Sequence, residues 1–168
     1  MGKRSEFKRR KNDAYMTWDK RAVLPLVPHI PVGARYAEPC CGDGSLITNL
    51  SSHGLICNYS GDIATGQDAM ALSDYNIQDC DYVITNPPWT RAILHPMKDH
   101  FRKLKPTWLL FDADWMHTKQ AKPYMPYCWK IASVGRVRWI PDSKMDGKDN
   151  VCWYLFGDGV RATIFVGR

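Results

Sequence analysis

The chain has 168 residues, of which 45% are hydrophobic and 24% are charged, and this balance favours one globular domain over a disordered chain. Its net charge of +6 favours a polyanionic partner. The six cysteines form no CxxC pair and no zinc-finger spacing, which predicts reduced thiols in a cytoplasmic protein and no metal site. No apolar run is long enough to span a membrane, and no signal-peptide pattern follows the basic start.

The first twelve residues form a strongly basic segment. Its cationic residues are Lys3, Arg4, Lys8, Arg9, Arg10 and Lys11. We expect residues 1–12 to be a flexible arm, which either only solubilises the protein or contacts phosphate groups. Residues 13–168 are predicted to form a single domain.

Hydrophobic patterning along this domain predicts strands that alternate with helices. In chain order, we expect helices at 20–27, 45–53 and 93–104, one helical turn at 68–72, and strands at 34–40, 56–61, 81–85, 107–111, 132–140, 151–156 and 162–166. This order predicts an α/β, Rossmann-like, doubly wound fold with a mostly parallel sheet and an antiparallel C-terminal hairpin. Ligands bind such sheets beyond the carboxyl ends of the strands.

A glycine-rich turn follows the predicted strand at 34–40. It reads Glu38-Pro39-Cys40-Cys41-Gly42-Asp43-Gly44. The two glycines allow a tight turn and a close approach to a ligand. Ile47 replaces the third small residue of the dinucleotide-binding pattern, and no Lys-Ser/Thr pair follows, so neither a dinucleotide nor a P-loop is favoured. The acidic Glu38 favours a cationic ligand.

Two aspartates follow the predicted strand at 56–61. Asp62 can accept hydrogen bonds from ribose hydroxyls, and Asp68, followed by Ala69 and Met70, can recognise the edge and face of an adenine. Each aspartate alone is more often a helix cap or a solvated turn residue. The order of the glycine turn and both acids favours a nucleoside-like cofactor.

The most specific motif is Asn86-Pro87-Pro88-Trp89, at the end of the predicted strand at 81–85. Two prolines make the turn rigid, and the Asn86 side-chain oxygen and the Pro87 carbonyl are placed to accept both protons of a planar –NH2 group. Trp89 offers a face for stacking a base. Taken alone, four such residues are usually a proline-rich loop with a capping Asn. Their position after a strand and a complete cofactor pattern favours an acceptor site.

Together these motifs resemble those of class I S-adenosylmethionine-dependent methyltransferases, although the family's second helix and third strand are shortened here. The resemblance rests on residues 38–44, 60–63 and 68–70, and it implies S-adenosyl-L-methionine as cofactor. Tyr15 and Thr17 match an aromatic-x-Thr-Pro segment of DNA adenine methyltransferases, with Trp18 in place of Pro. The implied cofactor-binding residues are Tyr15, Thr17, Glu38, Cys40, Gly42, Gly44, Asp62, Ile63, Asp68, Ala69 and Asn86, and the implied catalytic residues are Asn86, Pro87, Pro88 and Trp89.

In this family, Asn-Pro-Pro-aromatic marks enzymes that methylate adenine N6, cytosine N4 or a glutamine amide. Asn in the first position with Trp in the last favours adenine, so we expect an N6-adenine methyltransferase that acts on DNA without a separate target-recognition domain. The target base would have to be flipped out of a duplex. The alternatives are an RNA adenine or protein glutamine methyltransferase, or a non-catalytic binding subunit. We expect a nucleic-acid-associated monomer with no membrane partner.

Overall fold

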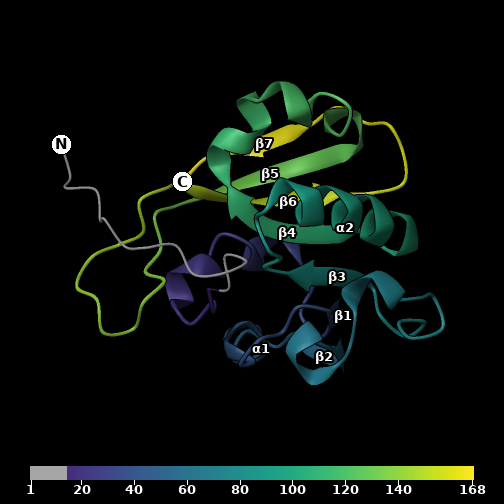
Figure 1. Ribbon diagram of the computed structural model, residues 1–168, viewed down its shortest axis with the longest axis horizontal. Coiled ribbons are helices and arrows are strands. Elements are labelled where there is room, and N and C mark those ends of the chain that lie inside the picture. Colours follow the sequence, from purple (N-terminus) through teal and green to yellow (C-terminus); the bar gives the residue numbers. More distant parts are fainter. Residues whose placement is uncertain (1–14) are drawn as a thin grey trace.

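The fold is built on a seven-stranded sheet, seen in the computed structural model, which describes residues 15–168 (Figure 1). The predicted basic arm at 1–12 lies outside the described residues. The sheet order is β2-β1-β3-β4-β6-β5-β7. The strands are β1 (Arg35–Glu38), β2 (Ile56–Ser60), β3 (Tyr82–Thr85), β4 (Thr107–Asp112), β5 (Cys128–Gly135), β6 (Val151–Phe156) and β7 (Ile164–Val166).

One strand runs against the direction of the others. β1 pairs in parallel with β2 and β3, β3 with β4, and β5 with β7, whereas β6 is antiparallel to both of its neighbours, β4 and β5. The predicted α/β fold with a mostly parallel sheet and an antiparallel C-terminal hairpin is therefore confirmed. Strand order reverses between β1 and β3, because the chain places β2 on one side of β1 and β3 on the other.

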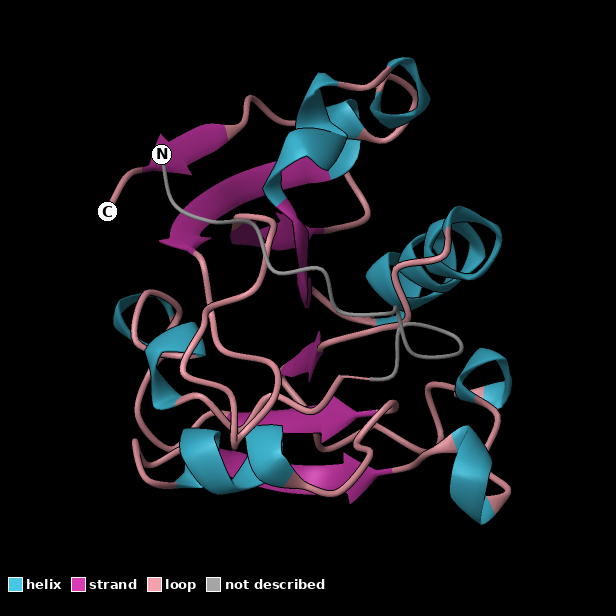
Figure 2. Ribbon diagram, turned by 60° about the vertical axis from the view of Figure 1, so that its left-hand side comes forward, coloured by secondary structure: helices cyan, strands magenta, loops and turns pink. Residues whose placement is uncertain are grey.

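Helices cover both faces of the sheet (Figure 2). The helix α1 (Ser45–Ser51) buries Leu46 and Leu50 in one core, together with the N-terminal turns. The longer helix α2 (Arg91–Leu104) buries Leu94 and Phe101 in the core on the opposite face. The central strand β4 is apolar on both sides because each of its faces packs against one of these cores.

Short 3-10 turns complete the fold. They are η2 (Lys20–Ala22), η3 (Val27–His29), η4 (Ile63–Thr65), η5 (Ala69–Ala71), η6 (Ala113–His117), η7 (Lys119–Ala121) and η8 (Met125–Tyr127). The helix expected at 20–27 is wrong, because Pro25 and Pro28 limit this segment to η2 and η3. The helical turn expected at 68–72 is present as η5.

The strand expected at 132–140 is wrong in its bounds, because β5 begins four residues earlier and ends at Gly135. Gly135 has a φ of 88°, which breaks the extended backbone and ends the strand there. Lys130 interrupts the apolar pattern at the start of β5, which is why the sequence does not reveal it. The correction matters for the site, because it moves residues 136–140 out of the sheet and into the long loop that joins β5 to β6.

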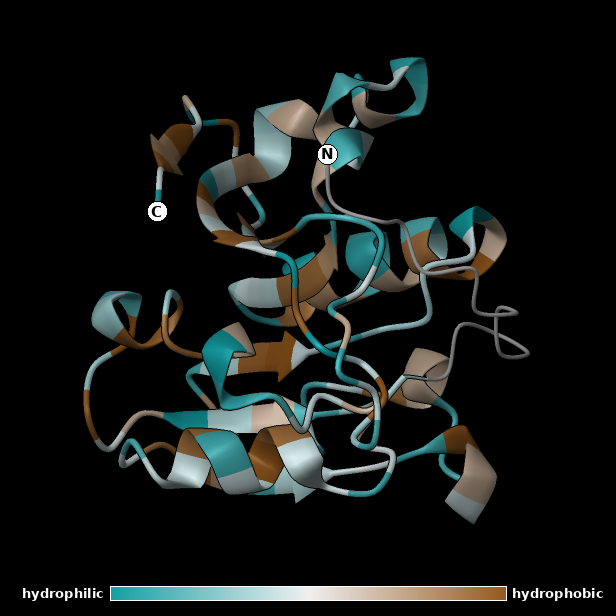
Figure 3. Ribbon diagram, turned by 90° about the vertical axis from the view of Figure 1, so that its left-hand side faces the viewer, coloured by the Kyte–Doolittle hydropathy of each residue, from teal (hydrophilic) through white to brown (hydrophobic). Residues whose placement is uncertain are grey.

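The two edges of the sheet differ in character. β2 has alternating exposed and half-buried residues, whereas the β7 edge exposes Ile164 and Phe165, each to about 60%. Figure 3 shows β7 as a brown, hydrophobic strand next to the C-terminus. No charged residue lies within β7 itself, so this edge lacks the protection that charged side chains give many edge strands.

One lysine of α2 points into the core and is buried there. The Lys98 side chain is fully buried, and its Nζ lies 3.5 Å from the centre of the Tyr124 ring and 3.9 Å from that of Trp115. Nζ has no hydrogen-bond partner among residues 15–168. Burial lowers the pKa of Lys98 to about 6, so the aromatic faces replace water only in part.

Replacing this lysine with an apolar residue of similar length is expected to stabilise the fold. The folded pKa lies below the unfolded one, so the cost of holding Lys98 grows as pH falls from about 10.5 towards 6. Lys98→Met is expected to raise the free energy of unfolding by about 2–4 kcal/mol at pH 7, and by less at pH 9. Denaturant unfolding at both pH values measures this. Lys103→Met, at an exposed position of the same helix, is the control. An equal gain from both variants would contradict the assignment.

Candidate functional site

The carboxyl ends of β1 and β3 are joined by a buried hydrogen bond. Glu38 is the last residue of β1 and Thr85 the last residue of β3, and the two strands are neighbours. The Thr85 hydroxyl donates to Glu38 Oε1, which also accepts from the Cys40 backbone N–H at 3.0 Å. The glycine turn and the Asn86–Trp89 turn, distant in the sequence, therefore start side by side at the point where strand order reverses. Ligand sites of α/β sheets lie at such points.

Glu38 is a carboxyl group with one unsatisfied oxygen. The residue is fully buried, and its Oε2 has no hydrogen-bond partner among residues 15–168. The pKa of Glu38 is raised to about 8, because burial and, to a smaller extent, the nearby Asp62 outweigh the opposing hydrogen bonds from Thr85 and Cys40. A buried acid of this kind is stabilised in its charged form by a cationic donor.

The glycine turn is held from both sides. Gly42 and Gly44 have φ values of 51° and 81°, in the left-handed region that favours glycine. The Gly42 N–H donates to Asp62 Oδ2 at 2.9 Å, which ties the turn to the end of β2. Met16 lies against Gly42, since a Cβ at this position would be 2.3 Å from the Met16 sulfur. A Cβ at Gly44 would meet nothing within 4 Å, so the space beside Gly44 is open.

Both predicted cofactor-binding aspartates cap short turns. Asp62 Oδ1 accepts from the Ala64 N–H at 2.8 Å, and Asp68 Oδ1 accepts from the Met70 N–H at 2.9 Å. The structural role considered for each aspartate is therefore present. Asp62 also contacts the glycine turn, whereas the hydrogen bond of Asp68 stays within its own turn. Ile63, beside Asp62, is 73% exposed.

The Asn86 side chain has a fixed orientation. Its Nδ2 donates to the Tyr15 carbonyl and to the Thr17 hydroxyl, both at 3.0 Å. Its Oδ1 accepts from the Trp89 indole N–H at 3.1 Å, and the same N–H reaches the Leu110 carbonyl at 3.2 Å. An indole N–H can only donate, so the amide oxygen must face Trp89. One lone pair of Oδ1 remains available.

The segment 15–18 covers the site. The Asn49 side chain of α1 donates to the carbonyls of Thr17 and Trp18, at 2.8 and 3.2 Å. Asn86 also donates to this segment, so hydrogen bonds from Asn49 of α1 and from Asn86, which follows β3, hold it in place. The structure thus places Tyr15 and Thr17 beside Asn86. Their contact with a cofactor stays a prediction.

Trp139 is a residue of the site that the sequence analysis missed. Its ring meets Trp89 edge to face, with 5.6 Å between centroids, and lies 6.2 Å from the Tyr15 ring. Gly147 has no space for a side chain, since a Cβ there would be 2.6 Å from the Trp139 ring. The predicted strand at 132–140 hid this role. The sequence does show Pro141 two residues after Trp139, and Gly147 in the polar stretch that follows. This pattern indicates a loop rather than a strand at Trp139.

An ionic link fastens the loop at 136–150 to the N-terminal segment. Arg21 lies 2.6 Å from Asp19 and 2.6 Å from Asp146 of the loop. The Arg138 N–H also donates to Asp19 at 2.8 Å. Loop and segment therefore hold Trp139 and Tyr15 in place together.

The remaining predictions concern thiols, metals and membranes. Burial raises the pKa of the Cys40 thiol, so Cys40 stays protonated at neutral pH. Residues 15–168 contain no cluster of His, Cys, Asp and Glu fit to hold a metal ion. Among the helices in this part of the chain, none is both long and apolar enough to cross a bilayer.

Comparisons with known proteins find no match in sequence and a distant likeness to solved structures. No protein-family model matches the chain, and no curated protein matches its sequence. The solved structure of precorrin-6y C5,15-methyltransferase from Geobacter metallireducens GS-15 is similar over 82% of this chain and 87% of its own, with 8% identity and a TM-score of 0.47. Precorrin 8w decarboxylase from Methanobacterium thermoautotrophicum is similar over 82% and 89%, with 11% identity and a TM-score of 0.39. Likeness at this level does not bear on function, which rests on the residues of the site.

The raised pKa of Glu38 predicts a stability that depends on pH. The folded pKa exceeds the unfolded one, so stability is fully present below about pH 4.5 and is lost as pH rises through about 8. Glu38→Gln cannot ionise, so it is expected to exceed the parent by about 2–4 kcal/mol at pH 8.5 and to match it near pH 4.5. Unfolding curves at both pH values measure the gap. Asp74→Asn, at an exposed position, should show no such change. A gap that does not vary with pH would refute this account of Glu38.

Proposed function

We propose that the protein is an S-adenosylmethionine-dependent methyltransferase that transfers a methyl group to the N6 amine of adenine in DNA. The observation that carries this proposal is the buried bond between Thr85 and Glu38, which brings a glycine turn beside an Asn-Pro-Pro-Trp turn. The first turn suits a methyl donor and the second suits a planar amine. Their juxtaposition is what methyl transfer needs, because the reacting atoms must be held in line at short distance.

The residues at the ends of β1 and β2 fit the proposed cofactor. The unsatisfied Oε2 of Glu38 suits the ammonium group of the methionine part, and the backbone beside Gly44 is open to a ligand. Asp62 keeps lone pairs for ribose hydroxyls, and the exposed Ile63 offers an apolar face that an adenine would cover. When bound, S-adenosyl-L-methionine would supply a methyl group on a sulfonium. We assign Asp68 and Ala69 to the adenine edge and Cys40 to the wall of the site.

The Asn86–Trp89 turn would position the acceptor amine. The second lone pair of Asn86 Oδ1 accepts one amine proton, and the Pro87 carbonyl, which accepts no hydrogen bond within residues 15–168, takes the other. These two bonds direct the nitrogen lone pair out of the ring plane and towards the methyl carbon. The new N–C bond forms as the C–S bond breaks, and the nitrogen then loses one proton to water.

Neighbouring residues keep the turn in this state. Thr17 and the Tyr15 carbonyl hold the Asn86 amide by its NH2 group, so that its oxygen stays on the side of Trp89. Trp89 is held in turn by the Leu110 carbonyl and by the edge contact with Trp139. We assign Thr17 and Trp139 to positioning, and Asn86, Pro87, Pro88 and Trp89 to contact with the acceptor.

Adenine in DNA is the acceptor that the sequence favours. Asn86 and Trp89 suit an adenine amine and a stacked base, and the net charge of +6 suits a polyanion. The basic arm at 1–12 would add phosphate contacts. RNA adenine and a protein glutamine amide present the same planar amine and are the alternative acceptors. A non-catalytic subunit is disfavoured, since it would have no use for both turns.

The proposal is tested by supplying labelled methyl donor to the purified chain with separate DNA, RNA and protein pools. Label is expected in DNA, with N6-methyladenine as the product found by mass spectrometry of digested nucleosides. Label confined to RNA adenine or to glutamine would move the activity to the corresponding alternative. No label in any pool would overturn the enzymatic function.

Asn86→Ala in the same assay tests the assigned chemistry. Loss of the amine acceptor is expected to lower transfer by about 100-fold or more, the scale seen when one preorganised hydrogen bond at a reacting centre is removed. Cofactor affinity measured by calorimetry should stay within about threefold, because Asn86 is assigned to the acceptor. Asn58→Ala, at an exposed position of β2, should transfer at the parent rate. Parent activity in Asn86→Ala would refute the acceptor site.

A further inference from the structure

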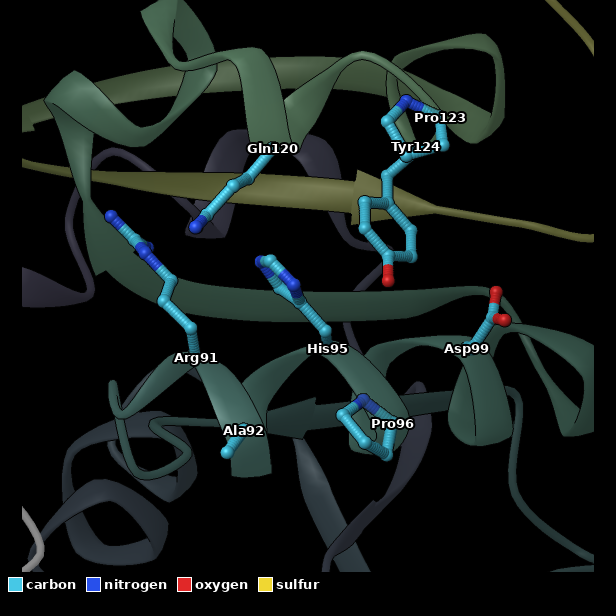
Figure 4. Close-up of a pocket in the computed structure, with 8 residues that line it drawn as sticks. All are labelled: Arg91, Ala92, His95, Pro96, Asp99, Gln120, Pro123 and Tyr124. Carbon is cyan, nitrogen blue, oxygen red and sulfur yellow. The ribbon is translucent and has the colours of Figure 1, made fainter.

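A groove lies between α2 and the segment 119–124, outside the turns described above (Figure 4). Arg91 and His95 rise from α2, and Gln120 descends from the opposite wall, so that their polar ends point towards one another. Asp99 and Tyr124 lie at the other end of the groove. Neither motif of the proposed active site accounts for this cluster.

His95 is held as a neutral donor. The Trp115 indole N–H donates to His95 Nε2 at 3.1 Å, which leaves the ring proton on Nδ1. Nδ1 has no hydrogen-bond partner among residues 15–168. Burial, together with the nearby Lys98 and Arg91, lowers the pKa of His95 to about 4. The groove therefore holds a neutral imidazole with one unused N–H.

The floor beneath His95 is rigid. Tyr124 lies 4.8 Å from His95, ring to ring, and it also packs against the buried Lys98 Nζ. Trp115 is fully buried and fixes both His95 and Lys98. The donors of the groove are therefore held in place before any ligand binds, which lowers the entropic cost of binding.

The charges favour an anion at the Arg91 end. Arg91 contacts Asp112 only at 3.5 Å, so most of its guanidinium donors remain unused within residues 15–168. Asp99 at the far end pairs with Arg102 at 2.8 Å, and Arg102 also pairs with Asp158 at 3.2 Å. The Gln120 side chain makes no hydrogen bond in the described part of the chain, and exposed Lys119 and Lys122 flank it. A guanidinium, an amide and an imidazole N–H that converge are the donor set that binds a tetrahedral oxyanion.

The groove also lies close to the acceptor turn. Arg91 is the first residue of α2 and follows Trp89 by two residues. We propose that this groove binds a phosphodiester group of the nucleic-acid strand beside the target base. The proposal rests on the proposed function, because the nucleic acid is the substrate of the neighbouring site. It assigns Arg91, His95 and Gln120 to holding the strand on one side of the base.

The test measures binding of labelled 12-nucleotide single strands that contain one adenine, as DNA and as RNA, at several salt concentrations. Arg91→Gln is expected to raise the dissociation constant about tenfold and to reduce the salt slope by about one phosphate contact. Arg35→Gln removes the same charge at the amino end of β1, opposite to the proposed site. It should change the dissociation constant and the salt slope only as far as the loss of one positive charge from the protein's net charge does. Gln120→Ala, at an exposed position, should weaken binding about threefold and serves if Arg91→Gln folds poorly.

A methylphosphonate in place of the phosphate next to the adenine locates the contact. In the parent, this neutral linkage is expected to weaken binding as much as Arg91→Gln does, and in Arg91→Gln it should have no further effect. Tighter binding of the RNA strand would identify RNA as the source of the phosphate. Equal losses in Arg91→Gln and Arg35→Gln, or additive losses from variant and linkage, would overturn the groove assignment. This experiment measures binding only, so it tests the groove separately from the methyl-transfer activity. If binding depends on the groove but no methylation is found, the groove assignment stands and the proposed function is refuted.

Discussion

The arrangement of the candidate site depends on one buried hydrogen bond, from Thr85 at the end of β3 to Glu38 at the end of β1. It lies where strand order reverses, and both turns of the site start from the two residues that it joins. The bond also has a cost, because Glu38 keeps one buried oxygen unsatisfied. A fold selected only for stability would place an apolar pair here, since burying a carboxyl group without full compensation is unfavourable. The proposed function relates this cost to a cationic ligand, which would pair with the unsatisfied oxygen.

A second layer of contacts encloses the acceptor turn. Asn86 and Asn49 clasp the segment 15–18, and the pairs that Arg21 makes with Asp19 and Asp146 tie this segment to the loop at 136–150. These contacts hold the loop where Trp139 packs edge to face against Trp89. The turn is consequently set by contacts from three distant parts of the chain, which gives it a single orientation before any substrate arrives.

The sequence was sufficient where the signal is local. The apolar runs that end at Glu38 and Thr85 predicted both strands. The two turns that follow them lie side by side in the fold, and their binding of ligands stays a prediction. The sequence was insufficient where contacts between residues far apart in the chain determine the local structure. The positive φ of Gly135 ends β5 earlier than predicted, and the prolines at 25 and 28 prevent the predicted helix. Trp139 packs against Gly147, where a side chain would collide with its ring. The hydrogen bonds from Asn86 to Tyr15 and Thr17 have no counterpart in any local pattern.

The central claim is that Glu38 and the glycine turn hold the amino-acid end of a nucleoside cofactor. The most direct measurement is calorimetric titration with S-adenosylhomocysteine at pH 7, in buffers that differ in ionisation enthalpy. The account predicts one-to-one binding with release of a proton, because the carboxyl of Glu38, whose pKa is about 8 in the free protein, ionises against the ligand ammonium. Absence of binding heat in every buffer, with no thermal shift, would contradict it.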